Sequence, residues 1–326
     1  RIKKINYKNK NEAKIAVAGC VGQAEGQEII DRSPIVDLVF GPLTYHQLPE
    51  MLEAIETEKG FPTKKLVNIE VPDIDKFDEL KGSRKSLKSI SSLLSVQEGC
   101  DKFCSFCVVP YTRGVEISRP AGQILKEAIE LIDNGAKELI LLGQNVNAWS
   151  GEGFDEENWS FPKLIKELSK LNIERIRYIT SHPKDMTDEL MRSHQDIEKL
   201  QPYLHLPVQS GSDKVLKEMN RGYTFSQYMK IINKTREYRP DIAVSGDFIV
   251  GFPGETDKDF EDTLKIVEEV KYAHAYSFKY SSRPGTPASM MENHIDETVK
   301  SERLKILQEL IKKYTRDFNK SFLGKE

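Results

Sequence analysis

The sequence predicts an α/β fold, most of which is a partial, TIM-like (βα)6 barrel that follows a smaller α/β unit. From residue 93 onward, short apolar segments alternate six times with longer amphipathic segments. Such an alternation is typical of parallel strands with helices packed outside them. Six units are too few to close the usual barrel of eight strands, so we expect an open barrel.

The expected elements follow one another without an internal repeat. Strands are expected at Leu93–Gln97, Glu138–Leu142, Arg175–Thr180, Tyr203–Pro207, Ile242–Val250 and Ala273–Tyr280. Helices are expected at Ala121–Asn134, Pro162–Lys170, Thr187–Ser193, Asp213–Met219, Phe225–Tyr238 and Asp257–Val270. Ligands of parallel α/β folds bind at the carboxyl ends of the strands, so the residues directly after each strand are candidates for a site.

A smaller α/β unit is expected before the barrel. Ile15–Gly19 and Val36–Gly41 are apolar segments that end in glycine, as short strands do, and Gln47–Lys59 has the pattern of a helix. Residues 72–92 are polar and lack a period, which favours a linker. The expected layout is a first unit at 1–80, a linker at 81–92, the barrel at 93–290, a long amphipathic helix at 291–320 and the start of a further domain at 321–326.

The composition is that of an ordinary globular protein. Of its 326 residues, 38% are hydrophobic and 30% are charged. We expect no membrane association, because no apolar run approaches the ~20 residues of a membrane helix. The sequence has no signal peptide and begins with Arg1, so a cytoplasmic fragment with reduced thiols is expected. The net charge of −3 does not favour nucleic acid, although two basic runs, 1–14 and 81–92, could follow phosphates or simply be solvated.

Three of the four cysteines stand together directly after the first barrel strand. Cys100, Cys104 and Cys107 are spaced so that their thiolates can converge on one metal centre. Three ligands leave a four-iron cluster with one open iron, which can bind a small molecule. A zinc site would require a fourth Cys or His nearby, yet Cys20 lies 80 residues upstream and His182 is far downstream. The spacing therefore favours an iron–sulfur cluster with a vacant position over zinc.

Polar or glycine-rich residues follow the other strands as well. Gly143 and Gln144 follow the second strand, where a glycine lets a ligand approach the backbone. His182 follows the third, but a lone histidine before a proline is more often a turn residue. Gln209 follows the fourth, and Arg221 is suited to a carboxylate, unless it is only a surface residue. The fifth strand contributes the glycine-rich segment Gly246–Thr256, in which Asp247 could accept a hydrogen bond from a hydroxyl. This segment matches neither a P-loop nor a dinucleotide fingerprint.

The loop C-x3-C-x2-C, with Phe106 before its last cysteine, resembles the radical S-adenosylmethionine (SAM) superfamily. The resemblance implies that Cys100, Cys104 and Cys107 hold a 4Fe–4S cluster whose fourth iron binds SAM. It implies that Gly143 and Gln144 hold the methionine end of SAM. By the same resemblance the carboxylate and ribose contacts are Ser181, Gln209, Arg221 and Asp247, and the residues that flank the adenine are Ile249 and Val250.

A longer set of motifs is more specific. The run Cys100–Pro120, with LGQNVNAW, TSHP, HLPVQSGS and MNRGYT further along, is similar to the methylthiotransferases, and the resemblance spans essentially the whole chain. It implies a second 4Fe–4S cluster in the first unit, of whose three cysteines only Cys20 is present here. It also implies that residues 321–326 begin an RNA-binding (TRAM) domain. We therefore expect that this chain alone cannot complete sulfur insertion.

The resemblance implies a radical reaction on tRNA. The expected reaction is methylthiolation of C2 of N6-isopentenyladenosine beside the anticodon, with a low-potential electron donor such as flavodoxin or ferredoxin. Tyr111 and Arg113 would stack on the anticodon loop and contact its phosphates, or only shape their own loop. The alternatives are a methylthiotransferase for an aspartate of a ribosomal protein or for threonylcarbamoyladenosine in tRNA, another radical enzyme, and a metal-stabilised binding module without turnover.

Overall fold

The computed structural model describes residues 14–55, 65–70 and 89–324, which form two compact units. Unit 1 comprises Arg1–Arg84 and Val108–Gly114, and unit 2 comprises Lys85–Cys107 and Val115–Glu326. The sequence placed 108–114 inside the barrel. Those residues form α6 (Val109–Arg113), which groups with unit 1 because it packs against α2 (Cys20–Glu25) and the 3-10 turn Pro42–Gln47.

Unit 1 is a three-stranded parallel sheet with helices. Its strands are β1 (Ala16–Ala18), β2 (Leu38–Phe40) and β3 (Leu66–Asn68), and its remaining helices are α3 (Gln27–Arg32) and α4 (Leu48–Ile55). The side chains of β2 alternate between two small cores: Val39 packs with Ile29 and Ile30, whereas Leu38 and Phe40 pack with Met51 and Ile55. The two predicted strands and the helix are confirmed with shorter bounds, although residues 56–59 of that helix lie outside the described residues. The sequence missed β3, α2 and α3.

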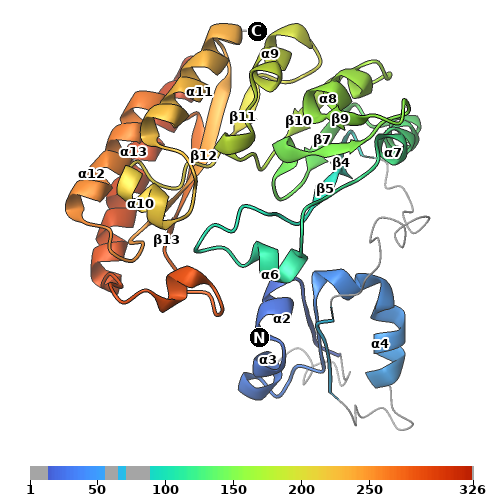
Figure 1. The fold of residues 1–326 in the computed structure, drawn as a ribbon, viewed down its shortest axis with the longest axis vertical. Coiled ribbons are helices and arrows are strands. Elements are labelled where there is room, and N and C mark those ends of the chain that lie inside the picture. Colours follow the sequence, from blue (N-terminus) through green and yellow to red (C-terminus); the bar gives the residue numbers. More distant parts are fainter. Residues whose placement is uncertain (1–13, 56–64, 71–88, 325–326) are drawn as a thin grey trace. The chain divides into compact units, whose positions relative to one another are not determined.

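Unit 2 is an open arc of six parallel strands in chain order (Figure 1). One sheet has the order β10-β7-β4, from β4 (Ser91–Ser95), β7 (Glu138–Leu142) and β10 (Arg175–Tyr178). The other has the order β11-β12-β13, from β11 (Tyr203–His205), β12 (Ala243–Val250) and β13 (His274–Lys279). The two sheets are joined by an isolated bridge between Ile176 and Leu200, just before β11, and by a hydrogen bond from the Ser181 amide to the His205 carbonyl at 3.3 Å. The predicted open barrel is therefore confirmed.

Seven helices accompany these strands in the described part of unit 2. They are α7 (Ala121–Asp133), α8 (Phe161–Ser169), α9 (Asp188–Asp196), α10 (Asp213–Glu218), α11 (Phe225–Tyr238), α12 (Asp257–Val270) and α13 (Glu297–Lys320). Their apolar faces and the strands form one large core. The last helix packs along β13 and α12, as expected of a helix beside the barrel, and it begins at Glu297 rather than 291 because Asp296 is its N-cap.

Two predicted segments differ from the structure. The expected linker ends earlier than 92, because β4 already begins at Ser91; residues 81–88 lie outside the described residues. The acidic stretch between Trp149 and Trp159, where the sequence predicted no strand, forms a hairpin of β8 (Ser150–Glu152) and β9 (Asn158–Ser160). Both tryptophans are buried in the main core, so burial of their rings holds the hairpin.

Candidate functional site

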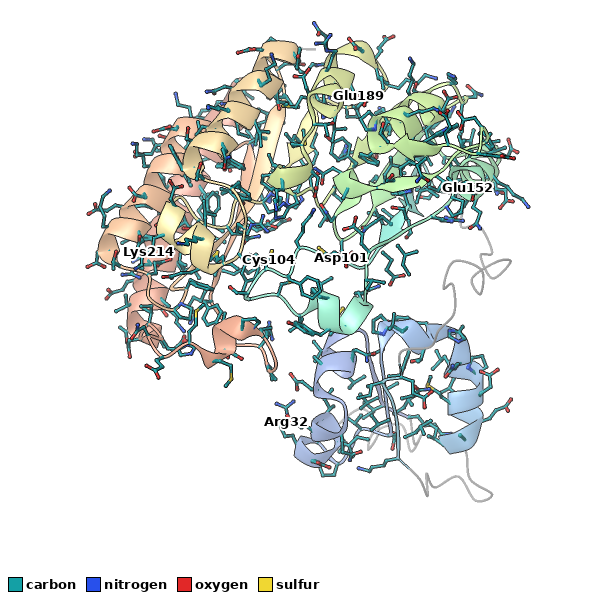
Figure 2. The ribbon with its side chains drawn as sticks, viewed as in Figure 1. Arg32, Asp101, Cys104, Glu152, Glu189 and Lys214 are labelled. Carbon is teal, nitrogen blue, oxygen red and sulfur yellow. The ribbon has the colours of Figure 1, made fainter. Side chains whose placement is uncertain are left out.

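The cysteine loop crosses unit 2 from the first sheet to the end of α10. It leaves β5 (Gln97–Glu98), which pairs with β6 (Ile117–Ser118). The Ser105 amide donates to the Met219 carbonyl at 3.0 Å, and its hydroxyl donates to the Glu218 carbonyl at 2.8 Å. The Asn220 side chain donates to the Phe103 carbonyl at 2.9 Å. Figure 2 labels Asp101 and Cys104 on this loop and Lys214 on α10. The loop is thus held in place by backbone and side-chain hydrogen bonds.

The three thiols of the loop share one environment. Cys104 is buried, and Cys100 and Cys107 are half-buried. The pKa of the Cys100 thiol is raised to about 11, chiefly by burial. Cys104, Glu116 and Cys107 contribute to the increase, and a hydrogen bond from the Lys102 amide opposes it. None of the cysteines, all of which are described, forms a disulfide. Among the described residues, no three potential ligands lie close enough together to bind a single metal ion. The ligands of a four-iron cluster do not need to, because each thiolate binds a separate iron.

Arg221 lies directly beside this loop. Its Nη1 donates to the Cys104 sulfur at 3.2 Å, its Nη2 to the Pro207 carbonyl at 2.7 Å and its Nε to the Tyr223 hydroxyl at 3.0 Å. Burial alone would lower the pKa of Arg221, but Tyr223 and Cys104 raise it, so the guanidinium stays charged. The sequence assigned Arg221 to a carboxylate of SAM. In the structure its nitrogens contact a cysteine sulfur, a backbone carbonyl and a tyrosine hydroxyl, and the carboxylate contact stays a prediction.

Three buried polar atoms near the ends of β7 and β10 have no hydrogen-bond partner among the described residues. They are Asn145 Oδ1, Ser181 Oγ and His182 Nε2. The segments that carry them pair directly: the Val146 amide donates to the Thr180 carbonyl, and Asn147 exchanges hydrogen bonds with the backbone of His182. Leaving a buried polar atom unpaired costs about 1–3 kcal/mol. A polar ligand at this edge would remove that cost.

His182 is both a turn residue, as predicted, and part of this edge. Its Nδ1 accepts from the Lys184 amide at 3.2 Å, so the proton of the neutral ring is on Nε2. The pKa of His182 is lowered to about 2, chiefly by burial and in addition by the positive charges of Arg221, Lys102 and Lys184. Nε2 is therefore a neutral donor at any working pH.

Strained backbone gathers in the same region. Six non-glycine residues have positive φ among those described, and four belong to the site: Phe103, Thr180, Gln209 and Asn220. Thr180 is β-branched, for which a φ of 67° is unfavourable. Such strain costs about 1–3 kcal/mol for each residue and is kept where it serves a function. The positive φ of these residues cannot be predicted from the sequence alone.

Gly143 and Gln144 shape the base of the cysteine loop. The Gln144 Oε1 accepts from the Gly99 amide at 2.7 Å, and a side chain at Gly143 would collide with Gln97. The Gln97 side chain in turn accepts from the Asn145 amide at 3.1 Å. The sequence assigned Gly143 and Gln144 to the ligand. In the structure their contacts are with the loop that carries the cysteines.

The inner side of β12 presents two of its three predicted residues. Asp247 lies 3.4 Å from His205 Nε2, while His205 Nδ1 accepts from the Thr180 amide at 3.1 Å. Ile249 is half-buried beside Phe106 of the cysteine loop. Val250, in contrast, is fully buried in the main core, so its side chain faces away from Asp247 and Ile249, and its contact with an adenine stays a prediction. Adjacent strand residues face opposite sides, which explains the difference.

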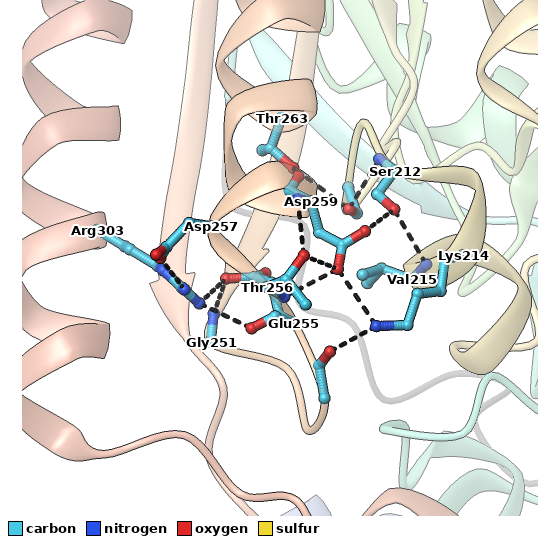
Figure 3. Close-up of polar contacts among 12 residues, drawn as sticks. Ser212, Lys214, Val215, Gly251, Glu255, Thr256, Asp257, Asp259, Thr263 and Arg303 are labelled. Atoms are coloured by element: carbon cyan, nitrogen blue, oxygen red, sulfur yellow. Dashed lines mark hydrogen bonds and ion pairs between the residues drawn. The ribbon is translucent and has the colours of Figure 1, made fainter.

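The loop after β12 is fixed by α13, a contact that the sequence did not reveal. Glu255 Oε1 accepts from the Gly251 amide at 2.8 Å and from Arg303 Nη1 at 2.8 Å (Figure 3). Arg303 Nη2 also contacts Asp257 at 2.7 Å. Burial raises the pKa of Glu255, and the Gly251 amide and Arg303 counteract this. The buried ion pair between Glu255 and Arg303 therefore connects the glycine-rich loop to α13.

The remaining predicted residues belong to unit 1. Cys20 is the first residue of α2 and is half-buried. Tyr111 and Arg113 lie on α6, where Tyr111 is 52% exposed and Arg113 is half-buried. The structure thus brings Cys20, Tyr111 and Arg113 into one unit, and the three cluster cysteines into the other.

Comparisons with known proteins show the family of the chain. The sequence model of the Radical SAM superfamily matches residues 94–267. The chain is 52% identical over 328 residues to a tRNA-2-methylthio-N(6)-dimethylallyladenosine synthase from Agrobacterium fabrum, and the match covers 99% of this chain and 71% of that protein.

Solved structures share the fold. The chain is similar to the radical SAM methyltransferase TsrM from Kitasatospora setae, with a TM-score of 0.62, 14% identity, and coverage of 86% of this chain and 57% of that one. It is also similar to coproporphyrinogen III oxidase HemN from Escherichia coli, with a TM-score of 0.51, 19% identity, and coverage of 71% and 54%. The chain spans just over half of either solved chain. It belongs to the Radical SAM superfamily and, within it, to the family of tRNA-2-methylthio-N(6)-dimethylallyladenosine synthases.

Proposed function

We propose that this protein transfers a methylthio group to C2 of N6-isopentenyladenosine beside the anticodon of tRNA. Its 52% identity to a synthase of that name supports this substrate. The observation that supports the chemistry is the cysteine loop, with three thiols in one environment beside an edge of unpaired polar atoms. That edge fits a polar cofactor, and the loop fits a cluster with one open iron.

As a member of the superfamily, the protein uses a 4Fe–4S cluster and SAM. We assign the cluster to Cys100, Cys104 and Cys107. Bound together, the reduced cluster and SAM supply a carbon radical that can remove hydrogen from an unactivated aromatic carbon. The residues assigned around SAM are Gly143, Gln144, Ser181, Gln209, Arg221, Asp247 and Ile249, to which the unpaired atoms add Asn145 and His182.

The chain's own residues orient the cofactor and exclude water. His182 Nε2 is a neutral donor and Asn145 Oδ1 an acceptor, so the pair suits a ligand that carries both a carboxylate and an amine. Asp247 is held by His205, which fixes its carboxylate for a hydroxyl. Besides its assigned contact with SAM, Arg221 donates to the Cys104 sulfur and would orient that thiolate.

We further propose that unit 1 is the auxiliary part of the enzyme. In this proposal Cys20 is one ligand of a second 4Fe–4S cluster, and Tyr111 and Arg113 contact the anticodon loop. Residues 1–80 and 321–326 would belong to the auxiliary-cluster and RNA-binding domains. The electron donor would be a flavodoxin or ferredoxin of the cytoplasm. None of the described helices is long and apolar enough to cross a membrane.

The test uses the complete protein, reconstituted anaerobically with iron and sulfide. Given SAM, reductant and isopentenylated tRNA, it should form the 2-methylthio nucleoside, detected by mass spectrometry. The variant Cys104→Ala should lose both this product and 5′-deoxyadenosine. Cys20→Ala should still form 5′-deoxyadenosine but not the product, with about four fewer irons for each chain. The Arg32→Ala variant, an exposed residue of unit 1, is the control and should behave as the unsubstituted enzyme.

The outcome also separates the alternatives. If isopentenylated tRNA is unchanged while a ribosomal protein or threonylcarbamoyladenosine is methylthiolated, the proposed substrate is wrong. If the purified protein carries zinc and no iron after reconstitution, the radical assignment of the cysteine loop is wrong.

A further inference from the structure

Strand β13 presents a row of aromatic rings on one face. His274, Tyr276 and Phe278 alternate along the strand, and Tyr276 and Phe278 are 57% and 55% exposed. The rings of Tyr276 and Phe278 are nearly parallel, with centroids 6.5 Å apart and an interplanar angle of 20°. His274 meets Tyr276 edge-to-face at 4.6 Å. Large exposed rings are costly on a surface without a partner. We refer to these three residues as the aromatic row.

The aromatic row faces the inside of the open arc. Lys279, on the opposite face of β13, contacts Glu297 and Ser301 of α13 at 3.0 and 3.3 Å. Because strand residues alternate, the even-numbered residues of β13 face away from α13. The inner face of a closed barrel is filled by side chains, whereas in this open arc the rings stay accessible.

The aromatic row adjoins the residues around the cysteine loop. In the parallel register Tyr276 pairs with Asp247, and Phe278 pairs with Ile249. Ile249 packs in the same small cluster as Phe106, which lies between two of the cysteines. The row therefore begins beside the cysteine loop and extends away from it along β13.

The polar groups of this inner face argue for one kind of partner. Asp247 and His205 lie next to the row, and further along the arc the Arg177 guanidinium stacks over the Tyr203 ring at 5.5 Å. Arg177 Nη2 pairs with Glu138 Oε1 at 2.9 Å, so this guanidinium is already neutralised. A protein partner would need a continuous apolar patch at the centre of its interface. Separate flat rings beside hydrogen-bonding groups match single-stranded nucleic acid instead.

We propose that the aromatic row is a stacking platform for the unpaired bases that accompany the target adenosine into unit 2. This inference rests on the proposed function and names the surface that receives the RNA. Every base has a flat face, so stacking tolerates any neighbouring sequence. The row would hold the splayed bases while the residues around the cysteine loop hold SAM.

The experiment measures binding of an isopentenylated anticodon stem-loop to the complete enzyme by fluorescence anisotropy. Tyr276→Leu and Phe278→Leu keep an apolar side chain but remove the flat ring. Each should raise the Kd about five- to a hundredfold, the equivalent of one lost base–aromatic contact. Tyr276→Phe should restore binding to within about twofold of the unsubstituted enzyme. Phe154→Ala removes a ring that is 66% exposed on another surface and should leave the Kd unchanged.

A second measurement needs no variant. The adenosine analogue 2-aminopurine, placed beside the target nucleotide, should lose fluorescence when the unsubstituted enzyme binds, because stacking on a ring quenches it. Kd values within twofold for both leucine variants, or no quenching in the bound complex, would overturn the inference. A failure of the proposed function looks different: the unsubstituted enzyme would then neither bind nor methylthiolate the stem-loop.

Discussion

The contact between Arg221 and Cys104 is the most consequential single interaction of the site. A buried guanidinium donates to a sulfur that we assign to the cluster, and Pro207 and Tyr223 hold its other nitrogens. Hydrogen bonds and positive charge at a ligand sulfur stabilise the added electron of a reduced cluster. Arg221 is therefore a positioning residue that makes reduction of the cluster easier.

Replacing Arg221 tests this at the residue scale. Arg221→Gln should lower the midpoint reduction potential by about 60–130 mV, the equivalent of a charge-assisted hydrogen bond of about 1.5–3 kcal/mol. Arg221→Lys keeps the positive charge but not the fixed geometry of the guanidinium. Its midpoint potential should therefore lie between those of the unsubstituted enzyme and Arg221→Gln. The potential is followed by electron paramagnetic resonance in the absence of SAM. An unchanged potential with a weakened SAM affinity would favour the carboxylate contact that the sequence suggested.

Single residues also show where sequence reasoning stops. The spacing of Cys100, Cys104 and Cys107 predicts a cluster loop, because the three residues lie close together in the sequence. Arg221 and Ser181 were predicted as residues of the site, but what each contacts depends on segments far away in the chain. The strained φ of Thr180 and the unpaired Asn145 Oδ1 exist only in the folded backbone, so no local pattern could reveal them.

At the scale of elements, α13 and the loop after β12 are joined by a buried ion pair. Arg303 and Glu255 are both more than nine-tenths buried, so neither charge has water as an alternative partner (Figure 3). Breaking a buried pair from one side leaves an uncompensated charge, which costs more than the pair itself contributes. The helix thereby stabilises the loop that follows Asp247 and Ile249.

Variants of this ion pair test its contribution to stability. Arg303→Met should lower the free energy of unfolding by about 3–5 kcal/mol, because Glu255 stays buried and unpaired. The double variant Arg303→Met/Glu255→Gln should recover part of that loss. Denaturant unfolding measures both. Lys258→Ala, which removes an exposed pair with Asp262, should change stability by less than about 0.5 kcal/mol. Equal losses in the single and double variants would contradict the argument.

The sequence located the elements unevenly. The helices 225–238 and 257–270 have the bounds that were predicted, because Thr224 and Thr256 form capping boxes that mark their starts. In contrast, β3 and the hairpin of β8 and β9 were missed. These strands have three residues each, too few to show a period, and long-range burial of Trp149 and Trp159 decides the hairpin.

At the scale of the whole molecule, the order of six strand–helix units was sufficient to predict the open arc, because parallel strands need helical crossovers. The grouping of 108–114 with unit 1 was beyond the sequence. Nothing in VVPYTRG indicates that this segment packs against α2, about 90 residues earlier in the chain. Contacts between distant segments are the part of a fold that local patterns specify least.

The stability of the molecule should depend on pH through two buried histidines. The pKa of His194 is lowered to about 4, chiefly by burial; Arg239 also lowers it, and a hydrogen bond with Gln201 raises it. The pKa of His182 is lowered to about 2, again chiefly by burial. Both values lie below the ordinary pKa of about 6.5 in the unfolded chain. Between the unfolded pKa and each residue's folded pKa, the unfolded state binds protons that the folded state does not. Stability is therefore fully present above pH 6.5 and falls as the pH decreases.

For each histidine the loss should be about 1.4 kcal/mol for every pH unit below 6.5, until the pH reaches that residue's folded pKa. Thermal unfolding midpoints at pH 7.5, 6.5 and 5.5 measure the slope. His194→Gln can keep a hydrogen bond to the Tyr178 hydroxyl, which lies 2.7 Å from His194 Nε2, and it should flatten the slope by about half because one of the two titrating groups is gone. His274→Gln, at an exposed position, should leave the slope as it is. If His194→Gln unfolds with an unaltered pH dependence, buried neutral histidine does not cause the acid sensitivity, and the carboxylates of the fold must account for it.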